Sequence, residues 1–132
     1  RAGPRPTMRV TTTHVLVDES APELIIGYYT LAAAQMLLAE LHPADQKRLP
    51  RYPVPAVRMA RLAVALSEQG KGHGARLLAH AVVRSLELRD HLGVHVMLVD
   101  AIHEQAAAFY RGYGFRVATS SGRTLYLPLG RT

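Results

Sequence analysis

The first half of the chain alternates apolar runs with turn residues, and this pattern predicts a β-hairpin followed by a loop. Residues 11–18 and 23–31 are rich in β-branched and aromatic residues, which favour strands, and the short turn between them predicts antiparallel pairing. Residues 32–41 fit either a helix or a continuation of the second strand. Four prolines make residues 42–55 a loop with room for one helical turn, because proline donates no backbone hydrogen bond.

The second half of the chain predicts a strand–helix–strand unit. Residues 56–65 are apolar, and a helix is expected at 74–92, where apolar residues recur at i, i+3, i+4 and i+8 and Gly93 follows as a C-terminal glycine. A buried-type strand at 94–102 should run parallel to the first, since a crossover helix joins them. The predicted order ends with a short helix at 103–111 and two short strands at 115–118 and 124–129.

Three glycines at alternate positions, Gly70, Gly72 and Gly74, separate the first strand of this unit from its helix. Such a loop turns the helix N-terminus into an anion site, because backbone N–H groups are free to point at a phosphate. The Gly-Lys-Ser/Thr pattern of a nucleoside-triphosphate loop is absent, because Lys71 is followed by glycine and not by serine or threonine. The loop therefore predicts a phosphate ligand without identifying it.

Composition narrows the class of protein. A chain of 132 residues with 48% hydrophobic residues predicts one folded domain over residues 1–132, in which residues 1–9 are a flexible or truncated N-terminus. The absence of cysteine excludes disulfides and thiolate metal sites and favours a cytoplasmic location. We expect no membrane segment, because no apolar run is long enough. The net charge of +6 fits either a basic surface or a polyanionic partner.

A second motif stands about thirty residues after the glycine loop, and the two together resemble a known family. The loop resembles Gln/Arg-x-x-Gly-x-Gly/Ala and the later segment resembles Ala-x-x-Phe-Tyr-x-x-x-Gly-Phe, the paired motifs of the GCN5-related N-acetyltransferases (GNAT family). The matching residues are Gln69, Gly72 and Gly74, then Ala106, Phe109, Tyr110, Gly114 and Phe115. The resemblance covers roughly residues 12–129. It implies an α/β (α+β) fold with a mixed central sheet, a splayed parallel strand pair and flanking helices.

The resemblance also implies an acetyl-CoA-dependent N-acetyltransferase that holds no metal. In the family the coenzyme A diphosphate lies on the loop amides and the pantetheine arm lies along the preceding strand, where a backbone N–H near Val64 would bind the oxyanion. Tyr110 would be the general acid that protonates the leaving thiolate, or would only pack beside the cofactor. The implied cofactor-binding residues are Ala63, Val64, Gln69, Gly70, Lys71, Gly72, His73, Gly74, Ala75 and Phe109.

Other candidates near this site have simpler interpretations. His103 and Glu104 are either a helix cap or a general base, and their adjacent positions do not suit a metal site. Asp100 is expected to be structural. Tyr113 is expected at the surface or at a dimer contact.

Residues 26–33, the proline-rich loop and the two motifs also resemble the acetyltransferase toxins of type II toxin–antitoxin modules. This narrower resemblance implies transfer to the α-amine of aminoacyl-tRNA, a ribbon-helix-helix antitoxin and a homodimer. Five basic residues would contact the tRNA or only form a solvated surface: Lys47, Arg48, Arg51, Arg58 and Arg61. The alternatives are transfer to a small amine, a peptide or a protein N-terminus, and a non-catalytic acyl-CoA-binding or RNA-binding module.

Overall fold

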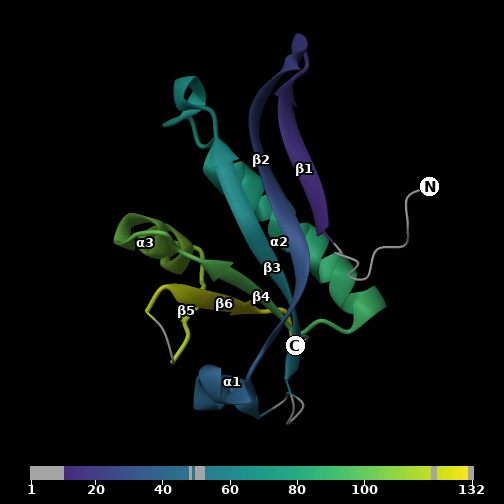
Figure 1. The fold of residues 1–132 in the computed structure, drawn as a ribbon, viewed down its shortest axis with the longest axis vertical. Coiled ribbons are helices and arrows are strands. Elements are labelled where there is room, and N and C mark those ends of the chain that lie inside the picture. Colours follow the sequence, from purple (N-terminus) through teal and green to yellow (C-terminus); the bar gives the residue numbers. More distant parts are fainter. Residues whose placement is uncertain (1–10, 48, 50–52, 120–121, 131–132) are drawn as a thin grey trace, which may run out of the picture.

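The computed structural model describes residues 11–47, 49, 53–119 and 122–130. Six strands form one sheet, and helices pack beside it (Figure 1). The elements in chain order are β1 (Thr11–Asp18), β2 (Ala21–Met36), the 3₁₀ turn η1 (Leu38–Glu40), α1 (Pro43–Gln46), β3 (Val54–Val64), the 3₁₀ turn η2 (Leu66–Glu68), α2 (His73–Leu92), β4 (Val96–Asp100), α3 (Glu104–Gly112), β5 (Arg116–Val117) and β6 (Thr124–Pro128).

The strands lie in the order β1-β2-β3-β4-β6-β5. Only β3 and β4 are parallel among the described pairs, and α2 joins them as the crossover helix. The mixed sheet and the parallel pair are therefore confirmed. Gly93 ends α2 with a φ of 69°, and its N–H donates to the carbonyl of Arg89 at 3.1 Å, as expected of a C-terminal glycine.

Residues 32–36, the first half of the segment that fitted either a helix or a strand, continue the second strand. β2 extends to Met36 and is followed by the short η1 turn. Its first part pairs with β1, and from Gly27 to Met36 it pairs with β3. The alanines of this segment favour a helix by intrinsic propensity, so it is the pairing with β3 that decides its conformation, and β1 reaches only Ala32. The predicted helical turn in the proline-rich loop is α1.

Two apolar clusters cover opposite faces of the sheet. Met97 and Val99 of β4 belong to one cluster, and Val96 and Leu98 belong to the other. Successive strand residues point to opposite faces, so β4 is buried on both sides, as its apolar sequence predicts. The first cluster includes Leu77 and other residues of α2 and α3, which therefore cover the same face. No described helix is both long and apolar enough to span a membrane.

A β-bulge in β3 separates the paired part of this strand from the part that borders the glycine loop. Parallel pairing with β4 stops at Met59↔Val99. On the other side, Leu31 pairs with Met59 and Thr30 with Arg61, which leaves Ala60 unpaired. A bulge bends its strand and increases the local twist. The ends of β3 and β4 accordingly diverge in Figure 1.

The bulge also decides which side chains of β3 face α2. Val57 and Met59 belong to the cluster under α2, and Leu62 and Val64 pack against that same cluster. If the strand alternated regularly through Ala60 with no bulge, Leu62 and Val64 would point to the opposite face. The bulge therefore keeps the last part of β3 against α2 while its backbone leaves β4.

Candidate functional site

The glycine loop connects β3 to α2 through two residues with left-handed backbone conformations. Gly70 has a φ of 81° and Gly72, the N-cap of α2, has a φ of 84°. A Cβ atom at either position would meet no atom within 4 Å, so space does not require glycine here. The positive φ does, because a side chain in this region costs about 1–2 kcal/mol.

The first turn of α2 presents backbone donors at this loop. The N–H of Arg76 donates to the carbonyl of Gly72 at 3.2 Å and is the first hydrogen bond of the helix. No side chain caps the helix start, and no acidic residue lies in its first turn. The N–H groups of His73, Gly74 and Ala75 precede the first helical bond and face the loop, where the positive end of the helix dipole favours an anion.

Charged side chains surround these donors. The Nζ of Lys71 lies 3.4 Å from Oε1 of Glu68, and Nε2 of His73 lies 3.5 Å from the same oxygen. Glu68 therefore places one carboxylate beside the basic side chains of the loop that is predicted to bind phosphate. Sequence reasoning missed Glu68, although its position three residues before Lys71 is a signal for such a pair.

Gln69 connects the loop to the strand. Its Nε2 donates to the carbonyl oxygen of Val64 at 3.1 Å. The bond joins the residue that opens the loop to the last residue of β3. Gln69 thus holds the loop against the strand in this structure.

The backbone of β3 beyond the bulge has one edge without a strand partner in the described part of the chain. Ala65 donates to the carbonyl of Ile26 in β2, so alternation directs the backbone groups of Ala63 toward β2 as well. Those of Leu62 and Val64 point the other way, where β4 has diverged. The free N–H groups at this edge thus belong to Leu62 and Val64. Leu62 was not among the predicted residues.

Tyr110 lies on α3 with only 8% of its surface exposed. Its ring packs against those of Phe109 and Phe115, with centroids 5.3 Å and 5.6 Å away. Burial raises the pKa of Tyr110, so the phenol keeps its proton at neutral pH. Tyr110 and Val64 border the same apolar cluster, which brings the end of β3 and α3 to one side of the sheet.

Phe109 brings α3 to the glycine loop. A Cβ atom at Gly74 would lie 3.9 Å from Cζ of Phe109, so the two predicted cofactor residues are neighbours. Phe109 is half-buried and packs edge-on against Tyr113, whose own side chain is exposed. The surface position predicted for Tyr113 is confirmed.

His103 caps α3. Its Nδ1 accepts a hydrogen bond from the N–H of Ala106 at 3.0 Å, so the capping interpretation is confirmed. Glu104 pairs with Arg111 at 2.6 Å, and that contact lowers the pKa of the carboxyl. A lowered pKa makes Glu104 a weaker base. Asp100 pairs with Arg58 and accepts from Thr124, which confirms its structural role.

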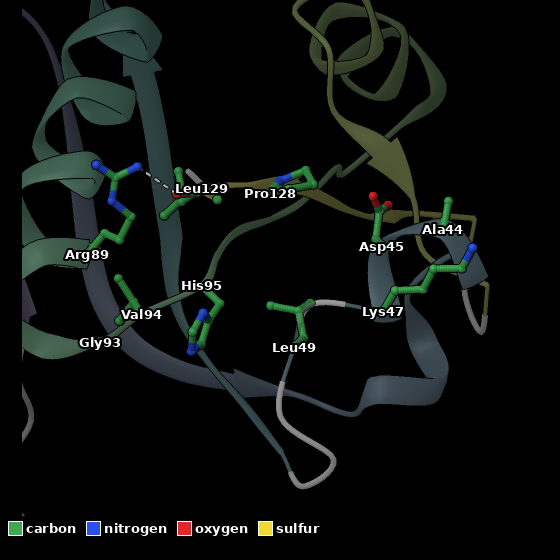
Figure 2. A pocket seen from close by; sticks show the side chains of 11 residues that line it. Ala44, Asp45, Lys47, Leu49, Arg89, Gly93, Val94, His95, Pro128 and Leu129 are labelled. Carbon is green, nitrogen blue, oxygen red and sulfur yellow. Dashed lines mark hydrogen bonds between the residues drawn. The ribbon is translucent and has the colours of Figure 1, made fainter. Parts of the chain in front are cut away.

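Of the five basic residues predicted to contact nucleic acid, the three that the structure describes are not gathered into one patch. Arg58 is committed to Asp100, and Arg61 is exposed on β3 beyond the bulge. Lys47 lines a cavity of about 710 Å³ at the opposite end of β3, beside the C-terminal end of α2 (Figure 2). Each strand residue advances about 3.3 Å, which puts Arg61 about 23 Å along β3 from the end nearest α1. Arg48 and Arg51 lie outside the described residues.

In that cavity, Nη1 of Arg89 donates to the carbonyl of Leu129 at 2.8 Å, as Figure 2 shows. The described residues contain no group of three or more histidine, aspartate or glutamate side chains that could hold a metal ion.

The chain is similar to known proteins at the level of family and of sequence. The family model described as "Acetyltransferase (GNAT) domain" matches residues 12–117. The tRNA-acetylating toxin of Mycobacterium tuberculosis (strain ATCC 25618 / H37Rv) is 34% identical over 103 residues, which are 78% of this chain and 61% of that protein. This chain therefore spans less than two thirds of that relative's length.

Two solved structures share the fold. AtaT complexed with acetyl-methionyl-tRNAfMet superposes with a TM-score of 0.84 at 30% identity, covering 90% of this chain and 71% of the other. A tyrosine-to-phenylalanine mutant of AtaT, bound to the C-terminus of the antitoxin AtaR and to acetyl-CoA, has a TM-score of 0.73 at 27% identity, covering 91% and 69%.

Proposed function

The chain belongs to the acetyltransferase (GNAT) family, and we propose that it transfers an acetyl group from acetyl-CoA to a primary amine. We treat residues 1–132 as one acetyltransferase domain. The acceptor we propose is the α-amine of an aminoacyl-tRNA, which would make the protein a translation-blocking toxin. Similarity to the tRNA-acetylating toxin and to AtaT supports this acceptor.

One geometric feature supports the chemistry above all others. The bulge at Ala60 turns β3 away from β4, so the N–H groups of Leu62 and Val64 face an edge that no described strand occupies. The same strand leads directly into the N–H donors at the start of α2. If the diphosphate of acetyl-CoA lies on those donors, the pantetheine arm and its thioester would extend along this edge.

The chain's own residues then have separate roles. The loop amides from Gly70 to Ala75 and the Lys71 ammonium would bind the diphosphate, while Phe109 packs beside it. The Val64 N–H would hold the carbonyl oxygen as negative charge develops there. Gln69 is a positioning residue, because its amide holds the carbonyl of Val64.

The proposed acetyl transfer needs one acid, Tyr110, for its bonds and protons to balance. The amine nitrogen forms a bond to the acetyl carbon, the carbon–sulfur bond breaks, and the Tyr110 phenol protonates the departing thiolate. The amine loses its extra proton to water, and water restores the proton of Tyr110. An α-amine has a pKa of about 7.7–8.0, so a fraction is neutral near pH 7 without a strong base.

The proposed partners follow from the same relatives. AtaT has been solved with the antitoxin AtaR, and we propose a ribbon-helix-helix antitoxin for this chain. We also propose a homodimer with exposed Tyr113 at the contact, and a cytoplasmic location where charged tRNA is available. Arg61 and Lys47 remain candidates for contact with tRNA phosphates.

Labelled acetyl-CoA tests this function directly. The chain is incubated with charged tRNAs, free amino acids, small amines and peptides, and the labelled products are separated. We expect label on aminoacyl-tRNA. Label on small amines or peptides alone would contradict the proposed acceptor, and calorimetry showing no binding of acetyl-CoA would contradict the enzyme itself.

A further inference from the structure

A second cavity, lined by basic side chains, lies between β1, β2 and the first half of α2. Its volume is about 530 Å³, and His14, Tyr29, Arg76 and His80 supply its polar side chains together with Thr13. No carboxylate is among the described residues that line it. The cavity thus combines basic and hydroxyl groups without an opposing acid.

The cavity borders the glycine loop. His73, Arg76, His80 and Arg84 are spaced at i, i+3, i+7 and i+11, so they form one basic stripe along α2 that begins at the loop. Nη1 of Arg76 lies 3.3 Å from Nδ1 of His73, the first residue of the helix. Arg76 therefore stands between the loop donors and the cavity.

Inside the cavity, the side chains of Tyr29 and His80 form a hydrogen bond with each other. The Tyr29 hydroxyl lies 2.6 Å from Nδ1 of His80. Burial raises the pKa of Tyr29, so the phenol keeps its proton and is able to donate it to Nδ1 of His80. When the phenol donates to Nδ1, Nε2 of His80 carries a proton and is left as a donor.

His14 supplies a buried nitrogen without a partner. Its ring stacks on Tyr29 with centroids 4.9 Å apart and an interplanar angle of 20°. Its Nε2 is buried and has no hydrogen-bond partner among the described residues. Buried polar atoms normally have one, so an unpaired nitrogen in a basic cavity marks a position for a ligand atom.

We propose that this cavity is a second phosphate site, separate from the loop amides, and that it takes the 3′-phosphate of coenzyme A. The identification of this phosphate as part of coenzyme A rests on the proposed acetyltransferase function. The ribose of coenzyme A carries the 5′-diphosphate and the 3′-phosphate on one ring, so a diphosphate on the loop would place the second group nearby. Arg76, Nε2 of His80 and Nε2 of His14 are the donors for it.

Proton uptake should accompany binding at this site. Burial, and then the charges of His80 and Arg84, lower the pKa of His14 in the free chain. Tyr29 faces it from β2, and Arg76, His80 and Arg84 lie on α2. Glu87 of α2 pairs with Arg84 and raises the pKa of Tyr29, but it does not line the cavity. A phosphate dianion reverses the balance, because it stabilises the protonated imidazole. The preference for the 3′-phosphate should therefore increase from pH 8 to pH 6.

Calorimetry with coenzyme A and 3′-dephospho-coenzyme A tests the proposal on the intact chain. Two variants remove donors: Arg76→Gln, and His14→Phe, which keeps a ring against Tyr29. Arg89→Gln is the matched control, because it removes the same charge from α2 about 20 Å from Arg76. Thermal melting checks that each variant is folded.

We expect the unmodified chain and Arg89→Gln to bind coenzyme A about tenfold more tightly than 3′-dephospho-coenzyme A. Both cavity variants should lose most of this preference while their affinity for 3′-dephospho-coenzyme A is unchanged. An equal affinity of the unmodified chain for both nucleotides would overturn the second site and leave the acetyl-CoA proposal intact. If neither nucleotide binds, the proposed function fails instead. If Arg76→Gln keeps the preference but weakens binding of tRNA, the cavity holds nucleic-acid phosphates and the proposal is wrong.

Discussion

Replacing Glu68 by glutamine should strengthen the binding of coenzyme A. The carboxylate lies 3.4 Å from the Lys71 ammonium and 3.5 Å from the His73 ring, and a diphosphate on the loop has to share both partners with it. Glutamine keeps the size of the side chain and removes the negative charge. The variant therefore isolates the competition between Glu68 and the phosphates.

The size of the effect follows from the distance and exposure of this pair. Two unit charges 3.4 Å apart in bulk water attract by about 1.2 kcal/mol, and the entropy lost in ordering two long side chains offsets part of this attraction. Measured exposed pairs contribute about 0.2–1 kcal/mol. The affinity of Glu68→Gln for coenzyme A should thus rise by about 1.4- to 5-fold at low salt.

Calorimetric titration at low salt and at 1 M salt measures this change. Glu87→Gln is the matched control, because Glu87 forms a similar i,i+3 pair with Arg84 but lies at the far end of the basic stripe of α2. The gain in Glu68→Gln should disappear at 1 M salt, where charges are screened within about 3 Å. An affinity that is unchanged or weaker at low salt would refute the competition.

Three further substitutions test other parts of the structure. Tyr110→Phe should lower turnover by about 10²- to 10⁴-fold without changing coenzyme A affinity, and full activity in a steady-state assay would remove Tyr110 as the acid. Gly27→Ala should cost about 1–3 kcal/mol in urea unfolding, because its Cβ atom would lie 2.7 Å from the Ala63 carbonyl oxygen and 2.8 Å from Cδ1 of Leu77. Gly112→Ala, where nothing lies within 4 Å, is its control, and equal stabilities would contradict the close approach. The lowered pKa of His14 means that the unfolded chain binds more protons, so stability should fall as pH drops below about 6.5. The His14→Phe variant should show a smaller fall between pH 8 and pH 5, and parallel curves would contradict the shift.

Local sequence signals identified much of the candidate site. Alternate glycines before an amphipathic helix predict the loop, because positive φ angles and free N–H groups depend on a few neighbouring residues. His103 was recognisable as a cap for the same reason. The parallel strand pair followed from a single crossover helix between two apolar runs.

Tertiary contacts decided what the sequence left open or did not indicate. Residues 32–36 are strand because they pair with β3, which overrides the helix propensity of alanine. The bulge at Ala60 depends on how β3 matches β2, so no local residue pattern predicts it.

The sequence by itself therefore determined the glycine loop, its helix and the motif that contains Tyr110. Only the folded structure showed the free backbone edge at Leu62 and Val64, the carboxylate of Glu68 beside Lys71, and the cavity in which His14 meets His80 across Tyr29. A glycine loop is specified by neighbours in the chain. His14 and His80 are 66 positions apart, and pairing of β1 with β2 under α2 brings them together.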